Sequence, residues 1–158
     1  MPGDVKKVLR KFEYGVYVVT MGQGNSGNAF TASWVSQVSS EPPMVAVAVK
    51  SEHQSTPKMK EHGAFVVNLI PEGREEVAKT YYGPAESGYE KLRKAILKDS
   101  PATKTPILSG ALGWLDCEIV ETVKAGNHTL FIGEVKDGGI ERDDHILTKT
   151  NTGLSYGG

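Results

Sequence analysis

The sequence is poor in cysteine: Cys117 is the single thiol among 158 residues. One thiol excludes an intramolecular disulfide and a zinc site built from several thiolates, and it fits a reducing cytoplasm. The residues around Cys117, Leu115 to Ile119, alternate between apolar and polar side chains. We therefore predict that Cys117 is a buried packing residue on the apolar side of a strand rather than a reactive group.

Long apolar runs and an excess of one charge are missing as well. The longest apolar run, residues 44–49, is far too short to span a bilayer, and the first twelve residues lack the apolar stretch of a signal peptide. The 18 Lys and Arg nearly balance 19 Asp and Glu, for a net charge of -1. We therefore expect a cytoplasmic protein with no nucleic-acid partner and no membrane partner. The length predicts one domain, residues 1–158.

Two further kinds of site are not expected from the spacing of residues. The four histidines lie far apart in sequence and have no thiol partner, which argues against a metal site. They are His53, His62, His128 and His145. No serine lies in a G-x-S-x-G elbow, so the many serines do not indicate a nucleophile.

Alternating apolar and polar residues predict a mainly β domain with a few short helices. Strands are expected at residues 14–21, 28–38, 44–49, 64–70, 111–123 and 127–136, and helices at 4–12, 56–63, 72 to about 82, and 86–98. The run 44–49 is apolar on both faces, so we expect this strand to lie centrally in the sheet. Thr56 is expected to cap the second helix and Gly63 to end it. The regular hairpin spacing predicts a closed Greek-key barrel.

A glycine-rich run at residues 22–27 has the spacing of the G-x-G-x-x-G dinucleotide fingerprint. That fingerprint works only where the glycines open a helix that receives a pyrophosphate at its N-terminus. The residues that follow, Phe30 to Val35, have a period near two and a β-rich composition. The run therefore predicts a hairpin turn, in which Gly and Asn supply positive φ at low cost.

Hydroxyl groups are concentrated in residues 27–57, which otherwise look like strand, corner, strand and helix start. They belong to Thr31, Ser33, Ser36, Ser39, Ser51, Ser55 and Thr56. A buried hydroxyl without a partner costs on the order of 1–3 kcal/mol, so these groups need partners. Neutral hydrogen-bonding groups with an aromatic and a few cations suit a large, flat ligand that carries a phosphate, such as flavin mononucleotide (FMN).

Five motifs, taken in order, give the sequence a family resemblance. They are Tyr14 to Thr20, Asn28 to Trp34, Val38 to Pro43, Asn68, and Gly126 to Val135. Together they resemble the flavin reductase-like family of FMN-binding split barrels, and flavoredoxins in particular. The resemblance covers nearly the whole chain, and it implies a homodimeric split β-barrel that holds FMN non-covalently near the subunit interface. Pyridoxamine-phosphate oxidases share this barrel, but less of their phosphate-binding arginine and lysine pattern is present.

The resemblance also assigns roles to residues of this chain. It implies Asn28 and Trp34 at the isoalloxazine, Thr31, Ala32 and Ser33 along the flavin, Ser51, Ser55 and Thr56 at the phosphate, and Lys91 and His128 as catalytic residues close to the flavin. Thr56 could instead reach the ring. The alternatives are an exposed helical lysine for Lys91 and a structural strand histidine for His128.

A cation or strong donor beside the N1–C2=O edge of the flavin would raise its reduction potential, because reduction places negative charge there. One residue departs from the family pattern: Asn127 stands where many relatives carry an acid next to the histidine. If that acid orients the histidine or the nicotinamide, direct use of NAD(P)H is less secure.

Two functions are consistent with the sequence. The first is an oxidoreductase that passes electrons from NAD(P)H or a redox protein through bound FMN to flavin, ferric or protein acceptors. The second is an FMN-binding electron carrier without small-molecule turnover of its own.

Overall fold

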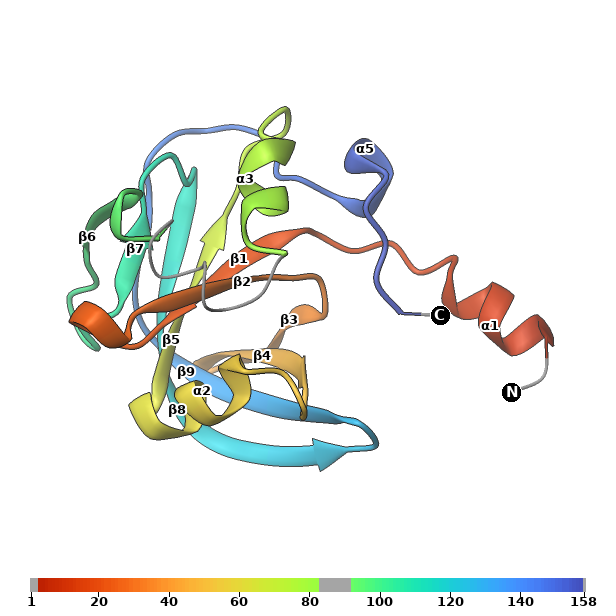
Figure 1. Cartoon of the computed structure of the whole chain (residues 1–158), viewed down its shortest axis with the longest axis horizontal. Coiled ribbons are helices and arrows are strands. Elements are labelled where there is room, and N and C mark those ends of the chain that lie inside the picture. The colour runs from red at the N-terminus through yellow and green to blue at the C-terminus, as the bar shows by residue number, and fades with distance from the viewer. Residues whose placement is uncertain (1–2, 83–91, 158) are drawn as a thin grey trace.

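The computed structural model describes residues 3–82 and 92–157, and these form a mainly β structure with a few short helices (Figure 1). The main sheet contains β1 (Tyr17–Met21), β2 (Asn28–Ala32), β3 (Val35–Ser40), β4 (Pro43–Lys50), β5 (Ala64–Leu69), β8 (Gly113–Ala125) and β9 (His128–Ile140). A separate hairpin consists of β6 (Ile96–Asp99) and β7 (Pro106–Leu108). The helices are α1 (Gly3–Leu9), the 3-10 turn η1 (Gly24–Ser26), α2 (Ser55–His62), α3 (Glu75–Thr80) and α5 (Lys149–Thr152).

The main sheet is antiparallel and its strand order is β2-β1-β5-β8-β9-β4-β3. β2 and β3 stand at opposite ends of this order, yet only Ser33 and Trp34 separate them along the chain. A link of this length spans roughly 10 Å, so the sheet curls until its two edges meet at this corner. The carbonyl of Trp34 accepts a hydrogen bond from the Ala48 amide at 3.0 Å and ties the corner to β4.

Two predictions about these strands were wrong. Residues 28–38 form two strands rather than one, because β2 pairs with β1 whereas β3 pairs with β4. The strand at 44–49, seen as β4, is second from one edge of the sheet rather than central. Its apolar pattern is explained by the curl, since Val45, Val47 and Val49 point into the enclosed core.

That core lies inside the curled sheet, where Phe65, Phe131 and Met59 are fully buried among valines of β1 and β4. Cys117 belongs to this core and is fully buried, as predicted. Burial, and secondly the neighbouring charge of Asp116, raise the pKa of the Cys117 thiol to about 12. The thiol is therefore a packing group at neutral pH.

The glycine-rich run forms the hairpin turn that the sequence predicts. β1 and β2 pair in antiparallel register from Tyr17↔Ala32 to Met21↔Asn28, with η1 between them. Gly22 and Gly24 have φ of 81° and 51°, values that favour glycine. No helix follows the run among the described residues up to Ser40, so the dinucleotide interpretation is excluded by the structure.

The helix after β4 ends at Gly63 with φ 72°, as predicted, but its start was misassigned. α2 begins at Ser55, whose amide donates to Nδ1 of His53 at 3.0 Å. The side chain that accepts from this amide at the start of the helix is therefore a histidine. The hydroxyl of Thr56 donates instead to the carbonyl of Lys50 at 2.9 Å. Thr56 therefore fastens the helix to the end of β4 rather than capping it.

The helix predicted over residues 86–98 lies partly outside the described residues, and its last part is wrong. Ile96–Asp99 form β6, in which Ile96 pairs with Leu108 and Asp99 pairs with Pro106. Pairing with a partner strand has overridden the helical spacing of apolar residues here. The helix α3 and the long strands β8 and β9 lie where the sequence predicts them.

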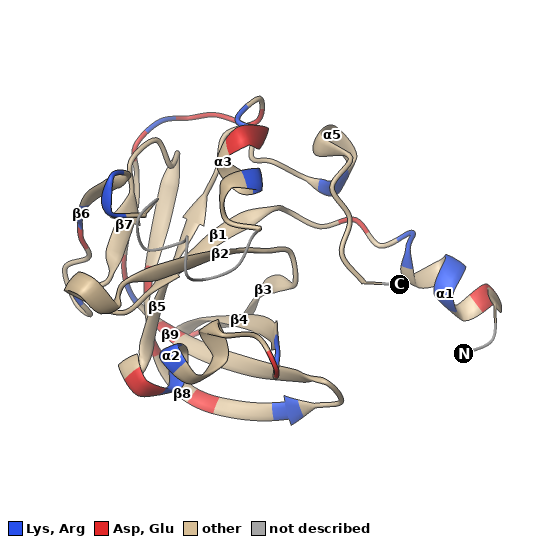
Figure 2. Cartoon of the chain, viewed as in Figure 1, with Lys and Arg blue, Asp and Glu red and all other residues tan. Residues whose placement is uncertain are grey.

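Charged residues of both signs are interspersed over the molecule, with Lys or Arg and Asp or Glu together on α1 and α3 (Figure 2). In residues 3–82 and 92–157, no helix has the length and apolar character needed to cross a membrane. Within the same ranges, no three His, Cys, Asp or Glu side chains are grouped as a metal would require.

Candidate functional site

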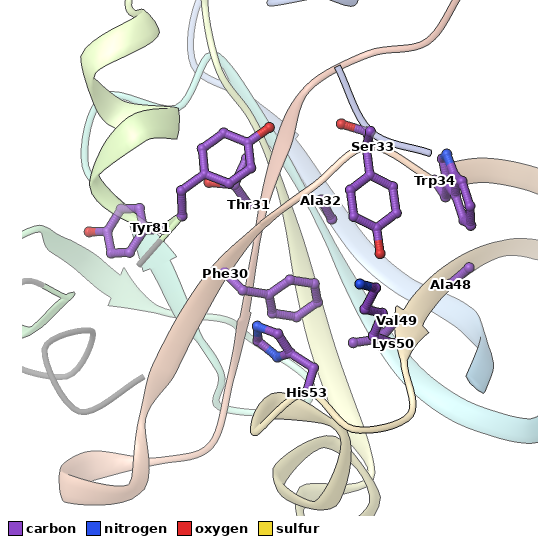
Figure 3. Close-up of a pocket in the computed structure, with 12 residues that line it drawn as sticks. Phe30, Thr31, Ala32, Ser33, Trp34, Ala48, Val49, Lys50, His53 and Tyr81 are labelled. Carbon is purple, nitrogen blue, oxygen red and sulfur yellow. The ribbon is translucent and has the colours of Figure 1, made fainter. Parts of the chain in front are cut away.

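A cavity of about 170 Å³ opens at the corner where the two edges of the curled sheet meet (Figure 3). The residues that line it are Phe30, Thr31, Ala32, Ser33, Trp34, Ala48, Val49, Lys50, His53, Tyr81, Tyr82 and Tyr156. We call it the corner pocket.

Four chain segments that are distant in sequence build the corner pocket. The end of β2 and the link to β3 form one wall, and the end of β4 with the following turn forms another. The residues after α3 contribute Tyr81 and Tyr82, and the chain end contributes Tyr156. In Figure 3 the side chains of Phe30 and His53 lie next to one another, and their ring centroids are 5.4 Å apart.

Rings from the corner, β9 and the chain end pack together at one side of the pocket. Trp34 lies 4.6 Å from the ring of His128 at 34° and 4.7 Å from Tyr156 in an edge-on arrangement. The Nε2 atom of His128 is hydrogen-bonded to the hydroxyl of Tyr156 at 2.8 Å. Its Nδ1 atom is bonded to Oδ1 of Asn127 at 2.7 Å. His128 thus reaches the pocket through its contacts with Trp34 and Tyr156.

The surroundings of His53 and His128 favour the neutral forms of both rings, and Lys50 supplies a positive charge to the pocket. Burial lowers the pKa of His53, and burial together with the nearby Lys50 charge lowers the pKa of His128. Lys50 pairs in register with His128 and its side chain lines the cavity. A planar ligand here would meet aromatic faces, hydroxyls and amides, and the ammonium of Lys50 near its edge.

The hydroxyls singled out in the sequence have found different partners. Thr31 donates to the carbonyl of Ala78 at 2.5 Å, which fastens β2 to α3. Ser51 shares a hydrogen bond with Thr129 at 2.9 Å, which joins the turn after β4 to β9. Ser33 is buried and lines the cavity. On β3, Ser36 is exposed to solvent and Ser39 is half-buried, and neither lines the pocket.

Among the residues that the structure describes, two buried side-chain atoms have no hydrogen-bond partner: Nδ2 of Asn28 and Oγ of Ser55. Asn28 precedes Phe30 by two positions on β2, and Ser55 follows His53 by two, so each is close in sequence to a pocket residue. A buried donor without a partner costs on the order of 1–3 kcal/mol. Such atoms are the groups that a polar ligand would satisfy. The donors present fit a flavin phosphate and ring better than they fit a metal.

The structure gathers most of the site residues expected from the sequence. Thr31, Ala32, Ser33 and Trp34 line the pocket, and His128 contacts Trp34. The three residues expected at a phosphate adjoin the Lys50–His53 turn; they are Ser51, Ser55 and Thr56. Lys91 lies outside the described residues.

Sequence reasoning missed several pocket residues. Lys50 and His53 lie within the hydroxyl-rich stretch, and the position of a cation and an imidazole between two groups of serines could have identified them. For Tyr81 and Tyr82 the sequence predicts only the end of a helix, whereas the structure places both in the pocket lining. Tyr156 sits in a polar, glycine-rich tail, and nothing in its local sequence indicates the pocket.

Comparison with known proteins places this architecture in a family. The family model described as "Flavin reductase like domain" matches residues 9–156. An "NADH:FMN oxidoreductase" of Rhodococcus qingshengii is 31% identical over 142 residues, which cover 90% of this chain and 72% of the relative. The solved structure of BorF, "the Flavin Reductase Component of a Bacterial Two-Component Tryptophan Halogenase", superimposes with a TM-score of 0.81 at 26% identity. That match covers 92% of this chain and 91% of BorF.

A longer relative shares the same domain. A "Putative diflavin flavoprotein A 2" of Nostoc sp. (strain PCC 7120 / SAG 25.82 / UTEX 2576) is 28% identical over 144 residues, or 90% of this chain. The chain spans about a quarter of the length of that protein, with 25% covered.

Proposed function

Because this chain belongs to the flavin reductase like family, we propose that it is an FMN-dependent oxidoreductase that takes electrons from NAD(P)H or a redox protein. It would pass these electrons to a flavin, a ferric compound or a protein. The chain is an enzyme of a flavin-reducing family. The observation that carries the choice of ligand is the corner pocket, which has aromatic walls and the cation Lys50 among its described residues, and whose lining residues Phe30 and His53 are each two positions from an unpartnered polar atom, of Asn28 and Ser55 respectively.

Residues of the pocket lining and residues close to them in sequence would hold the two ends of the ligand. Ser51, Ser55 and Thr56 would hold the phosphate at the start of α2, where amides and hydroxyls accumulate. Asn28 and Trp34 would hold the ring, with Thr31, Ala32 and Ser33 along the flavin. FMN supplies reversible acceptance of two electrons, and the protein supplies orientation and electrostatics around it.

The cations and histidines would tune the flavin. Lys50 reaches the cavity, so its ammonium can stabilise negative charge that develops on a reduced ring. The buried ring of His128 rests against Trp34 at 4.6 Å and keeps the indole in place. By family resemblance, Lys91 would add a second cation to this site.

A homodimeric split barrel, folded from the single domain of residues 1–158, is the architecture we propose. α1 projects away from the body of the protein and buries none of its residues (Figure 1). Its apolar side chains Val5, Val8 and Leu9 are 44%, 60% and 39% exposed, and Phe12, shortly after the helix, is 63% exposed. A helix of seven residues is unstable alone in water, so a second copy that covers this face would stabilise it.

A second candidate is an FMN-binding electron carrier. The match to one quarter of a diflavin flavoprotein favours this reading, because there the same domain is part of a larger flavoprotein. Mixing the yellow protein with NADH or NADPH distinguishes the two candidates. Rapid bleaching by the nucleotide alone supports the reductase, whereas bleaching only after a redox partner is added supports the carrier.

The flavin itself is tested by an absorption spectrum of the purified protein. Absorption bands at about 375 and 450 nm, the general signature of oxidised flavin, are expected after purification or after addition of FMN. If no flavin is retained under either condition, the cofactor assignment is lost. Adding FAD in a parallel titration decides between the two flavins.

Replacement of the corner aromatic, Trp34→Ala, tests the ring site. Trp34 is 36% exposed, so its loss should leave the domain folded while FMN retention falls by about tenfold or more. Fluorescence titration with FMN measures the affinity, and circular dichroism monitors the fold. A collapse of the fold would show that Trp34 is a core residue instead.

A further inference from the structure

The end of the chain is seated on the corner pocket by specific contacts. The hydroxyl of Tyr14 donates to the carbonyl of Tyr156 at 2.7 Å and accepts from the Tyr156 amide at 2.5 Å. Gly157 lies so close to Trp34 that an added Cβ would come within 2.3 Å of the indole. These contacts fix the backbone of residues 156–157, and with it the direction of the Tyr156 side chain.

That side chain completes a pair of hydrogen bonds to His128. Nδ1 of His128 is 2.7 Å from the side-chain oxygen of Asn127, and an amide oxygen can only accept. Nδ1 therefore carries the proton, and Nε2 is the acceptor in the neutral ring. The hydroxyl of Tyr156, 2.8 Å from Nε2, must then be the donor.

The charges around His128 also favour the neutral form of its ring. Lys50 on β4 pairs with His128 in register, and its positive charge lowers the pKa of the imidazole. On β8 the opposite residue is Ala125, which is uncharged. Burial, and secondly Tyr82, raise the pKa of Tyr156, so its hydroxyl keeps the proton that it donates.

We propose that Tyr156 is a positioning residue, whose hydroxyl holds His128 in the neutral Nδ1–H tautomer and keeps its ring against Trp34. For the reaction, this inference rests on the proposed function: an uncharged His128 leaves Lys50 as the cation of the described part of the pocket. The proton chemistry itself requires no flavin. In this chain the tyrosine and Asn127 together determine the tautomer, one at each ring nitrogen.

The test is the state of the His128 ring in the full-length protein, measured by long-range ¹H–¹⁵N correlation spectra over a pH titration. Wild-type protein should show the Nδ1–H tautomer. Tyr156→Phe keeps the aromatic ring but removes the donor to Nε2. The Nε2–H tautomer should then appear, and the pKa of His128 should rise, because the neutral form has lost its hydrogen bond.

Two further variants separate the hydroxyl from the tail as a whole. Tyr14→Phe removes the anchor of the Tyr156 backbone without touching His128, and it should shift the ring in the same direction by a smaller amount. Ser155→Ala changes an exposed tail residue beside Tyr156 and should leave the spectra of His128 unchanged. A wild-type ring in the Nε2–H form, or a His128 pKa that does not rise in Tyr156→Phe, would overturn the proposal.

The consequence for turnover is measured separately, with NADH and FMN-loaded protein. The acid side of the kcat/KM profile should move to higher pH in Tyr156→Phe, because His128 is protonated more readily. An unchanged profile together with a shifted tautomer would refute the role in the reaction. Absence of turnover with both NADH and NADPH in the wild type would instead count against a nucleotide-dependent reductase and leave the spectra of His128 decisive for the positioning role.

Discussion

Two regions of this protein bury polar side chains, and they treat them in opposite ways. In the first region, almost every polar group has a hydrogen-bond partner. We call it the Asp116 network; it consists of Asp116, Ala102, Thr103, Thr105 and His62. Beside the corner pocket, Asn28 and Ser55 each leave a polar atom without a partner. Asp116, Asn28 and Ser55 are all fully buried, so burial alone does not explain the difference.

The Asp116 network connects β8, the loop before β7 and α2. One carboxylate oxygen of Asp116 accepts from the amides of Ala102 at 2.8 Å and Thr103 at 3.2 Å, and the other accepts from the Thr103 hydroxyl at 2.5 Å. Hydroxyl contacts of 2.7 Å and 2.8 Å then lead through Thr105 to Nε2 of His62. A fully satisfied network of this kind fixes a loop to a sheet.

Asn68 shows the same completeness next to this network. Its amide nitrogen donates to the Val18 carbonyl at 3.0 Å and to the Thr20 hydroxyl at 3.1 Å, and its oxygen accepts from the Leu108 amide at 2.9 Å. Asn28 is equally buried, but its nitrogen has no partner. Satisfied groups hold the fold together, whereas unsatisfied groups beside a cavity favour a ligand that supplies the missing partner.

The largest effect is expected at Asp116. Asp116→Ala leaves the amides of Ala102 and Thr103 and the Thr103 hydroxyl without their acceptor, and it should lower the free energy of unfolding by roughly 3 kcal/mol. Urea unfolding followed by circular dichroism measures the loss. Asp143→Ala, at an exposed carboxylate, is the matched control and should change stability by less than about 0.5 kcal/mol. A small effect at Asp116 would mean that the network does not hold the loop.

The pair of buried asparagines gives the sharpest comparison. Asn68→Ala should cost about 2 kcal/mol of stability, because two acceptors, the Val18 carbonyl and the Thr20 hydroxyl, and one donor, the Leu108 amide, lose their partner. Asn28→Ala removes an unpaired donor and one bond to the Ala29 amide, so it should cost under about 1 kcal/mol. FMN affinity should respond in the reverse order and fall mainly in Asn28→Ala. Equal losses of stability would contradict the distinction between the two regions.

The smallest change in stability is expected at Ser55. Ser55→Ala removes a buried hydroxyl without a partner, so the free energy of unfolding should stay within about 0.5 kcal/mol of the wild type or rise slightly. FMN affinity should fall by roughly fivefold if the hydroxyl donates to the phosphate. Ser36→Ala, at an exposed serine of β3, provides the control and should alter neither quantity. An unchanged FMN affinity would remove Ser55 from the proposed phosphate site.

Much of the fold follows from local patterns in the sequence. Alternation indicated most of the strands, the glycine run predicted the β1–β2 turn, and Gly63 marked the end of α2. The hydroxyl-rich stretch pointed to the segment that forms two walls of the corner pocket. These features depend on a residue and its near neighbours, so a single sequence contains the information.

The remaining features depend on contacts between distant segments. The break between β2 and β3 exists because the two halves pair with different strands, and Ile96–Asp99 became a strand because β7 lies beside it. Tyr156 reaches His128 across 28 residues of chain, and only the curl of the sheet brings them together. The same holds for Asn28 and Asn68. By sequence they are two polar residues in β strands, and whether each amide has a partner depends on which backbone groups the tertiary structure places within about 3 Å of it.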